Sequence, residues 1–246
     1  MSAHSTIVGG SSAERVLACS GSIRLVREAI NKSSSYAKEG TALHEAMEHI
    51  LHEGLQPVDV QGMTFHGHQM TLPLIDECLR PAVQAFEKIV GERPFELEVA
   101  APLVGVDGAF GTSDVVYFDD DDETLLGIVD WKFGSGHAVR AAGNSQMMFY
   151  LYSQMMRADI EKRAAKLKAT IVQPRLGVVD TADYTATELT RFVFALSAAV
   201  SGPEVFRKGD WCHWCPGKPR CPEWWGKRVE KLQRFTVDRP SGRVVT

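Results

Sequence analysis

Two short apolar runs separated by an amphipathic stretch constrain the fold of this chain most strongly. Residues 125–131 and 167–173 each form a largely apolar run of the length expected for a strand. Residues 144–160, which lie between them, have the pattern of an amphipathic helix. A strand, a helix and a second strand in this order allow a crossover connection. The sequence therefore predicts an α/β domain.

Strand periodicity also precedes this unit. Phe95, Leu97 and Val99 alternate with Glu96 and Glu98, which predicts a strand, and residues 108–118 contain a second one. A short additional strand is expected at residues 178–179. Together these segments predict a central mixed sheet. The acidic run 119–123 is expected to be a solvated hairpin connection.

Helical patterns surround the predicted strands. A serine cap at Ser11 and the spacing of Leu43, Met47, Ile50 and Leu51 along one face are typical of helices. Helices are therefore predicted over residues 11–30, 40–54, 72–90, 144–160 and 187–200, with a kink at Pro81 in the third of them. We expect one domain over residues 1–246: a helical part over about 11–92, an α/β core over about 93–201 and a Cys-rich basic segment over about 202–246.

Composition excludes several other classes of protein. A chain of 246 residues with 44% hydrophobic and 24% charged residues is ordinary for a globular protein, and unlike a disordered, collagenous or disulfide-stapled one. No apolar run reaches the ~18 residues of a membrane span, and the first ten residues lack the pattern of a secretion signal. We therefore expect a cytoplasmic protein with reduced thiols and no membrane partner. Five cysteines in that compartment favour a metal site or free thiols over disulfides.

The net charge of −4 conceals an asymmetry. Residues 205–246 contain ten Lys/Arg and four Asp/Glu, a balance of +6, so the remaining seventeen Lys/Arg and twenty-seven Asp/Glu give −10. An acidic body can gather cations, and a basic tail can meet a polyanion. Ordinary charged residues on a solvent-exposed surface explain the charge of either half taken alone.

Two carboxylates interrupt neighbouring predicted strands. Asp114 and Asp130 each lie inside an apolar run, where a buried charge is costly unless it is paired or bound to a metal. Lys132 follows Asp130 by two residues, so both side chains share one face of the strand. Carboxylate oxygens suit Mg²⁺ or Mn²⁺, and an ammonium group can orient water or stabilise charge on a phosphate. The pattern fits phosphodiester hydrolysis, and it also fits an Asp–Lys ion pair with Asp114 capping a turn.

Four short motifs together resemble the RecB-type branch of the PD-(D/E)XK nuclease superfamily. They are Gly40-x-x-x-His44, Gly111-x-x-Asp114, Asp130-x-Lys132 with Gly134 after it, and Gln146-x-x-x-Tyr150. The resemblance implies a restriction-endonuclease-like fold, with a central mixed sheet flanked by helices. It also implies that the chain is a Mg²⁺- or Mn²⁺-dependent deoxyribonuclease.

The resemblance assigns a role to each motif residue. His44, Asp114, Asp130 and the backbone carbonyl of Trp131 would bind the metal, and Lys132 would be the catalytic base or position water. Gln146 and Tyr150, one helical turn apart, would face the site and contact DNA or neighbouring groups. Nothing in the sequence distinguishes His49 and His52 chemically from His44, whose selection depends on the resemblance. Glu98 is a weaker candidate, and Glu96 shares its face of the strand.

The cysteines form a second pattern. Cys212-x-x-Cys215 and Cys221 lie within ten residues, and Cys19 or Cys78 could supply a fourth thiolate, although Cys78 fits a helix core better. One distant upstream cysteine and C-x-x-C-x5-C downstream resemble the iron–sulfur nucleases of CRISPR adaptation and of some helicase–nucleases. That resemblance implies a [4Fe–4S] cluster on Cys19, Cys212, Cys215 and Cys221 that joins the two ends of the domain. Structural Zn²⁺, with His213 as an optional ligand, and free thiols stay open.

The resemblance extends over residues 11–221 to a family of uncharacterised bacteriophage nucleases. It departs from the usual motifs in the serine after Cys19 and in Trp131 between Asp130 and Lys132. We therefore expect a DNA exonuclease of phage recombination, replication or end processing, acting in the host cytoplasm if it is phage-encoded. A single-strand-binding or annealing protein is a candidate partner.

Three other functions stay open at this point: an endonuclease of the same fold, a non-catalytic DNA-binding recombination accessory, and a redox or metal sensor. DNA would track over the basic tail and a basic patch. That patch consists of Lys162, Arg163, Lys166 and Lys168. The tryptophans at 211, 214, 224 and 225 would stack bases or pack around the cysteines.

Overall fold

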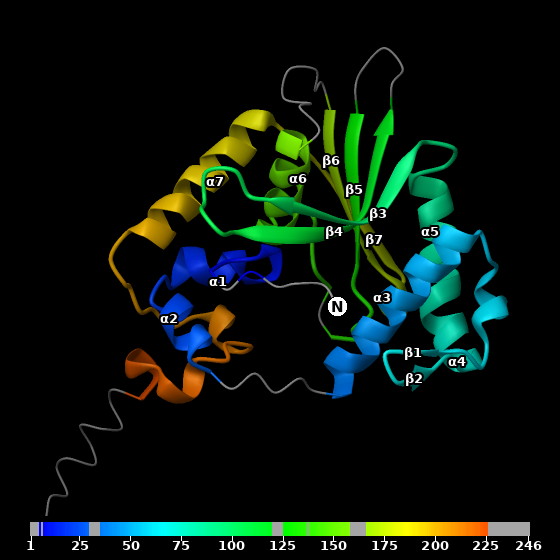
Figure 1. Ribbon diagram of the computed structural model, residues 1–246, viewed down its shortest axis with the longest axis horizontal. Helices are drawn as coiled ribbons and strands as arrows, with labels where there is room; N and C mark the ends of the chain where they lie inside the picture. Colours follow the sequence, from blue (N-terminus) through cyan, green and yellow to red (C-terminus); the bar gives the residue numbers. More distant parts are fainter. Residues whose placement is uncertain are drawn as a thin grey trace, which may run out of the picture.

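A five-stranded mixed sheet lies at the centre of the molecule (Figure 1). The computed structural model describes residue 5 and residues 7–29, 35–119, 125–136, 138–157 and 166–225. The strands stand in the order of the chain, namely β3 (Phe95–Pro102), β4 (Phe110–Asp119), β5 (Leu125–Trp131), β6 (Lys166–Gln173) and β7 (Val178–Tyr184).

The crossover predicted from the sequence is present. β5 and β6 pair in parallel, with Asp130 opposite Ile171, whereas the other neighbouring strands pair antiparallel. Helix α6 (Ser145–Arg157) lies between β5 and β6 in the chain and packs on the sheet. The α/β class with a mixed central sheet is therefore confirmed.

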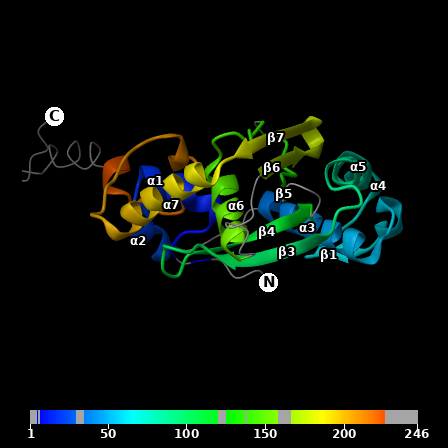
Figure 2. The same ribbon diagram turned by 90° about the horizontal axis from the view of Figure 1, so that it is seen from above.

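Helices cover both faces of the sheet, as the view from above shows (Figure 2). They are α1 (Ala13–Ala18), α2 (Ser22–Arg27), α3 (Ser35–Glu53), α4 (Leu72–Leu74), α5 (Arg80–Ile89), α6 and α7 (Ala186–Ser201). One hydrophobic core, the α6 core, joins α1, α6 and α7 to the sheet through side chains such as Val116, Ile128 and Phe149. The other, the α3 core, joins α3 and α5 to it through Tyr117 and Val129.

Short elements complete the fold. They are 3-10 helices at Gly10–Ser12 (η1), Pro57–Val60 (η2), Pro174–Leu176 (η5), Asp210–Cys212 (η6) and Lys218–Arg220 (η7), a π-helix at Ile75–Leu79 (η3) and a hairpin of β1 (Thr64–Phe65) and β2 (His68–Gln69). The segment predicted as one helix over residues 72–90 is divided into α4, this π-helix and α5, with Pro81 in the first turn of α5. The β1–β2 hairpin was not predicted.

The single helix predicted over residues 11–30 is wrong. The chain forms α1 and α2 instead, with a turn at Cys19, whose φ of −148° and ψ of 76° end the first helix. After this turn the Gly21 N–H donates to the carbonyl of Val205, and the ring of Phe206 lies where a side chain on Gly21 would stand. Tertiary contact with a distant segment therefore overrides the local helix pattern.

The strands β3 and β4 pass from one hydrophobic core to the other near two acidic residues, Glu98 and Asp114. Leu97 and Val115 belong with the α3 core, whereas Val99 contributes to the α6 core. Glu98 on β3 and Asp114 on β4 lie between these positions and are not paired in the ladder, and the φ of Glu98, 49°, is left-handed. Since their neighbours along the strands belong to different cores, these two carboxylates lie at the junction of the two cores.

The C-terminal segment packs against the first two helices. Ser20 Oγ donates to the Pro203 carbonyl at 3.0 Å, and Arg24 on α2 pairs with Glu204 at 2.8 Å. Gly217 approaches Leu25 so closely that an added Cβ would stand 2.6 Å from the Leu25 side chain. The described parts of the N- and C-terminal regions are thus in direct contact.

Parts of three predicted segments lie outside the described residues: the acidic connection from residue 120 to 124, the residues around Lys162 and Arg163, and the basic tail after residue 225. No helix in the described part of the chain is long and apolar enough to cross a lipid bilayer.

Replacing Gly127 with alanine should destabilise the protein. The ring of the opposite residue Tyr117 lies over Gly127, and an added Cβ would stand 2.0 Å from that ring. Overpacking of this kind costs about 1–3 kcal/mol. Gly40→Ala is the matched control, because a Cβ there meets no atom within 4 Å and should stabilise α3 by about 0.5–1 kcal/mol. Urea unfolding of both variants measures the difference, and equal effects would contradict the packing described here.

Candidate active site

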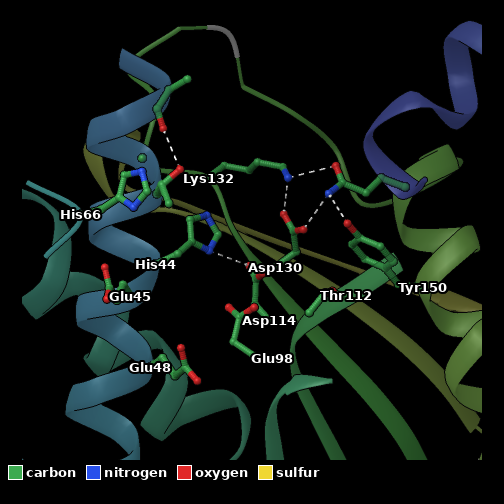
Figure 3. Close-up of a pocket in the computed structure, with 14 residues that line it drawn as sticks. His44, Glu45, Glu48, His66, Glu98, Thr112, Asp114, Asp130, Lys132 and Tyr150 are labelled. Atoms are coloured by element: carbon green, nitrogen blue, oxygen red, sulfur yellow. Dashed lines mark hydrogen bonds and ion pairs between the residues drawn. The ribbon is translucent and has the colours of Figure 1, made fainter. Parts of the chain in front are cut away.

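Side chains from five elements meet in one open cleft of about 520 Å³. Helix α3 supplies one wall and α6 the other, with the strands as the floor (Figure 3). The cleft is lined by the predicted residues His44, Asp114, Asp130, Lys132, Gln146 and Tyr150, and also by Glu98. The structure therefore brings together side chains that are up to 106 positions apart, from His44 to Tyr150.

Three of these side chains form a compact group of metal-ligand type. One ligand atom each of His44, Glu98 and Asp114 lies within 4.8 Å of the other two. Nδ1 of His44 is 3.4 Å from Oδ2 of Asp114, and the same oxygen accepts the Trp131 N–H at 2.8 Å. The ring of Phe133 meets His44 edge-on with centroids 5.2 Å apart. The imidazole is thus held from two sides.

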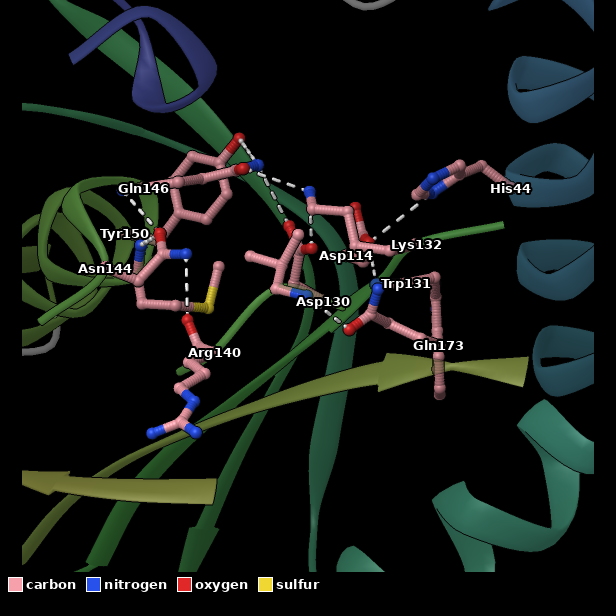
Figure 4. Close-up of polar contacts among 12 residues, drawn as sticks. His44, Asp114, Asp130, Trp131, Lys132, Arg140, Asn144, Gln146, Tyr150 and Gln173 are labelled. Carbon is pink, nitrogen blue, oxygen red and sulfur yellow. Dashed lines mark hydrogen bonds and ion pairs between the residues drawn. The ribbon is translucent and has the colours of Figure 1, made fainter. Parts of the chain in front are cut away.

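A second group joins the end of β5 to α6 (Figure 4). Nζ of Lys132 is 2.6 Å from Oδ2 of Asp130 and donates to Oε1 of Gln146 at 3.0 Å. Nε2 of Gln146 donates to Oδ1 of Asp130 at 3.0 Å and to the Tyr150 hydroxyl at 3.2 Å. The amide of Gln146 accepts from the lysine through its oxygen and donates to the carboxylate through its nitrogen, so Gln146 fixes both partners.

The electrostatics of His44 and Asp114 depend on each other. Burial would lower the pKa of His44, but the adjacent Asp114, with a smaller contribution from Asp130, raises that pKa to about 9. Burial would raise the pKa of Asp114, whereas His44, Lys132 and the Trp131 N–H together lower it. Both shifts favour an imidazolium–carboxylate pair between the two side chains.

Neighbouring positive charges neutralise Glu98 and Asp130 less fully than they neutralise Asp114. Burial and the negative charge of Asp114 raise the pKa of Glu98 to about 7. Burial also raises the pKa of Asp130, against the opposing effect of Lys132. One carboxylate oxygen of Glu98 lies within 4.8 Å of one of Asp114, so the two groups repel each other when both are ionised. A cation between them would remove this repulsion.

The donor set fits a hard divalent cation. Two carboxylates and one imidazole suit Mn²⁺ and Mg²⁺, with the imidazole favouring Mn²⁺. Oδ2 of Asp130, which is buried and has no well-oriented hydrogen bond, lies beside this group and could be shared with it. Left-handed backbone at Glu98 is a strained conformation of the kind found at ligand sites.

The structure separates candidates that the sequence left equal. Glu98 enters the cleft, whereas Glu96 pairs with Arg157 of α6 at 2.8 Å. The ring of His49 lies against Phe65, with centroids 5.7 Å apart, and exposed His52 pairs with Glu53. The Trp131 side chain is buried in the α3 core, and metal binding by its carbonyl stays a prediction.

Sequence reasoning missed several residues that line the cleft. Glu45 and Glu48 follow His44 on the exposed face of α3, and their helical spacing was a usable signal. His66 lies at the tip of the β1–β2 hairpin with a φ of 44°. The sequence could not predict His66 as a site residue, because strands of two residues are too short to show alternating hydrophobicity.

The four predicted cysteines line a second, smaller cavity. Cys19 is buried at the end of α1, and Cys212, Cys215 and Cys221 are half-buried on the facing C-terminal segment. Their sulfur atoms do not form a group within 4.8 Å like that of the cleft, as far as the described residues show. Cys78 is buried in the α3 core, as its helical position predicted.

Three of the four C-terminal tryptophans have packing roles. The indole N–H groups of Trp211 and Trp225 donate to the carbonyls of Arg207 and Lys218, each at 3.1 Å. Nζ of Lys218 stands 4.1 Å from the ring centroid of Trp224. Trp214, in contrast, is 85% exposed. In the predicted basic patch, Lys168 pairs with Asp183 at 3.1 Å.

Fold and site define a mixed α/β protein with a histidine–carboxylate–lysine centre at the junction of its two cores. A family model described as "Protein of unknown function (DUF2800)" matches residues 4–241, and the chain belongs to this family.

Solved structures show more distant similarity. One is SSO0001, which is 13% identical, with 91% of this chain and 89% of that chain covered and a TM-score of 0.46. Another is an alkaline exonuclease (LHK-Exo) from Laribacter hongkongensis, which is 7% identical, with coverages of 93% and 96% and a TM-score of 0.40. Because both TM-scores are below 0.5, these similarities assign no activity to this chain.

The metal-free protein should lose stability as the pH rises, and added Mn²⁺ should restore more of it at higher pH. The folded-state pKa values of His44 and Glu98, about 9 and about 7, exceed their ordinary values of 6.5 and 4.5. Each group therefore stabilises the fold fully below its ordinary pKa and loses that contribution as the pH passes its folded pKa. Metal binding needs neutral imidazole and ionised carboxylate, so it strengthens over the same window.

Thermal unfolding with and without Mn²⁺ at about pH 6, 7 and 8.5 tests this linkage. The melting temperature of the metal-free protein should fall by on the order of 5 °C, and the increment given by Mn²⁺ should grow. An increment that is independent of pH would contradict the assignment of His44 and Glu98 as ligands.

Proposed function

We propose that this protein is a divalent-metal-dependent deoxyribonuclease, and specifically an exonuclease. The observation that carries the proposal is the convergence of the His44–Glu98–Asp114 group with the Asp130–Lys132 pair in one open cleft. Neither an ion pair on a strand nor a capped turn requires a third carboxylate and a histidine at the same place. The motif resemblance independently assigns four of these five residues to a nuclease centre.

His44, Glu98 and Asp114 would hold the metal, with Asp130 as a shared ligand. A divalent ion held there lowers the pKa of bound water and neutralises charge on the phosphate that is attacked. Asp130 and Gln146 engage two of the three donors of the Lys132 ammonium. The remaining N–H can orient the attacking water or donate to a phosphate oxygen.

Tyr150 is set up as a donor to substrate. Its hydroxyl oxygen accepts from Gln146, so the hydroxyl proton is free to be donated outward. Burial and the nearby negative charges of Asp130 and Asp114 raise the pKa of Tyr150, so the phenol stays protonated. The ring fits between Gly10 and Gly111, where an added Cβ would stand 2.4 Å and 2.7 Å from it. Tyr150 therefore has a fixed position on the α6 side of the cleft.

The second part of the proposal concerns the cysteines. Cys19, Cys212, Cys215 and Cys221 would bind a [4Fe–4S] cluster, with Zn²⁺ as the rival, that fastens the C-terminal segment to α1 and α2. It is supported by their position around one cavity and by the contacts that already join these segments.

A role in phage recombination, replication or end processing extends the proposal and depends on the family resemblance alone. The same dependence holds for a single-strand-binding or annealing partner. An endonuclease of this fold would use the same cleft chemistry. A non-catalytic accessory would not need Lys132 held between Asp130 and Gln146.

Cleavage of end-labelled linear DNA with Mg²⁺, Mn²⁺ or EDTA tests the proposed activity. Degradation should require metal, and Asp130→Asn should reduce it by at least roughly 100-fold, because the Lys132 ammonium loses its ionic partner. Closed circular DNA is the control: an exonuclease leaves it intact, and an endonuclease does not. Failure of the wild-type protein to cleave with either metal would contradict the proposal, and so would full activity of Asp130→Asn.

Glu98→Gln should raise the Mn²⁺ concentration needed for half-maximal cleavage at least about tenfold, because a neutral amide is a poorer ligand than a carboxylate. Glu96→Gln is the matched control, since it removes the same charge two residues away, where the side chain pairs with Arg157. The metal dependence of Glu96→Gln should equal that of the wild type. If both variants respond alike, Glu98 is not a ligand.

A further inference from the structure

The first turn of α6 carries the residue that holds both members of the Asp130–Lys132 pair. The amide oxygen of Gln146 accepts from Nζ of Lys132, and its amide nitrogen donates to Oδ1 of Asp130, each at 3.0 Å (Figure 4). Because this side chain is short and both ends of its amide are engaged, the position of the Gln146 backbone determines where the two charged groups are held. A contact that fixes the first turn of α6 therefore also acts on the charge pair in the cleft.

Asn144 fixes this turn from the position just before the helix. Its Oδ1 accepts the backbone N–H of Gln146 at 2.9 Å and that of Met147 at 3.2 Å. These are the bonds of an N-cap, which satisfies N–H groups that the first turn of a helix leaves without a partner in the helix itself. One of the two N–H groups belongs to Gln146, so the cap directly holds the residue whose side chain bridges the charge pair.

Asn144 is itself held from two sides. Its Nδ2 donates to the Arg140 carbonyl at 3.0 Å, which orients the amide so that Oδ1 faces the helix (Figure 4). Its backbone N–H donates to the hydroxyl of Tyr184 on β7 at 3.2 Å, and that hydroxyl donates in turn to the carbonyl of Ala141. Tyr184 and Ala141 are both buried, and the Ala141 N–H also donates to Oδ2 of Asp180 on β7 at 2.6 Å. The cap of α6 is thus anchored to the edge of the sheet.

We propose that Asn144 is a positioning residue of the nuclease: it places the Gln146 amide so that Lys132 is held in the orientation that the reaction needs. The inference rests on the proposed function and adds a residue that does not line the cleft. The path of contacts leads from Tyr184 through Asn144 to Gln146. Without the cap the backbone of Gln146 can shift, and a displacement of about 1 Å at a group that orients substrate can lower the rate on the order of 100-fold.

The kinetics of DNA cleavage by the full chain with Mn²⁺ test the inference. Asn144→Ala should lower kcat at least about tenfold, because the Lys132 ammonium acts on the reacting phosphate. The proposed metal ligands lie on α3, β3 and β4, so KM and the Mn²⁺ concentration for half-maximal cleavage should stay within about twofold of the wild type. Asn144→Ser keeps an oxygen that can cap the helix and should restore kcat to within about threefold of the wild type.

Thr185→Ala is the matched control, because it removes the same kind of cap from another helix. Oγ1 of Thr185 accepts the N–H of Glu188 in the first turn of α7 at 3.2 Å, and no described residue of α7 lines the cleft. Urea unfolding should show similar losses of stability in Thr185→Ala and Asn144→Ala. The kcat of Thr185→Ala should nevertheless stay within about twofold of the wild type, which separates positioning from the general stability of a helix.

A double variant shows whether Asn144 acts through Gln146. In Gln146→Ala the bridge to Lys132 and Asp130 is already absent, so adding Asn144→Ala should lower kcat by less than about a further twofold. A residue that only stabilises α6 would lower kcat by the same factor in either background.

The inference and the proposed function fail in different ways. Wild-type kcat in Asn144→Ala, an equal loss in Thr185→Ala, or an undiminished effect in the Gln146→Ala background overturns the inference while the nuclease stands. If Asn144→Ala does not fold, Tyr184→Phe decides, since it removes the hydroxyl that holds Asn144: a loss of kcat that disappears in the Gln146→Ala background supports the inference, and an unchanged kcat overturns it.

A crystal structure makes the inference testable without activity. Wild-type protein that cleaves no DNA overturns the proposed function, and the structure of Asn144→Ala then decides the role of Asn144. A Gln146 amide that has lost its contacts with Lys132 and Asp130 supports the positioning role, whereas an intact bridge overturns it.

Discussion

The rest of the structure depends on how the charges of a buried carboxylate, Asp130, and a partly buried one, Asp114, are neutralised. Asp114 is paired with His44, which attaches α3 to one end of the floor of the cleft. Asp130 is paired with Lys132 and Gln146, which attaches α6 to the other. Since α3 and α6 belong to different hydrophobic cores, the same charges that form the site also join the two halves of the fold. The negative charge is less fully neutralised at Glu98, and the group that Glu98 forms with His44 and Asp114 could hold a cation.

The N- and C-terminal regions form a second unit, which polar contacts and an ion pair also hold together. The 3-10 helix η1 contacts Tyr150 at the cleft through Gly10, and α1, which follows it, ends at Cys19 in the cysteine-lined cavity. The C-terminal segment closes over α1 and α2 by polar contacts around Ser20 and Arg24. A metal centre in this cavity would therefore hold one wall of the cleft in place, without any part in the chemistry.

Much of the α/β core could be predicted because its strands and α6 have a clear hydrophobic periodicity. The remaining features of the fold depend on contacts between residues that are distant in the sequence. The site residues were located by motif resemblance and by the polar interruptions at Asp114 and Asp130. Glu96 and Glu98 could not be separated, because alternation gives both the same face and the left-handed turn at Glu98 has no local signal. The break after α1 was missed for a similar reason, since it depends on the approach of Val205 and Phe206 to Gly21.

The most direct test of the central claim is a crystal structure of the protein with Mn²⁺, in which the anomalous scattering of manganese locates the ion. The account predicts a peak between His44, Glu98 and Asp114, within about 2.0–2.6 Å of their ligand atoms and close to Asp130. A cleft without manganese at millimolar concentration, or an ion bound elsewhere while His44 and Asp114 keep their direct contact, would contradict it.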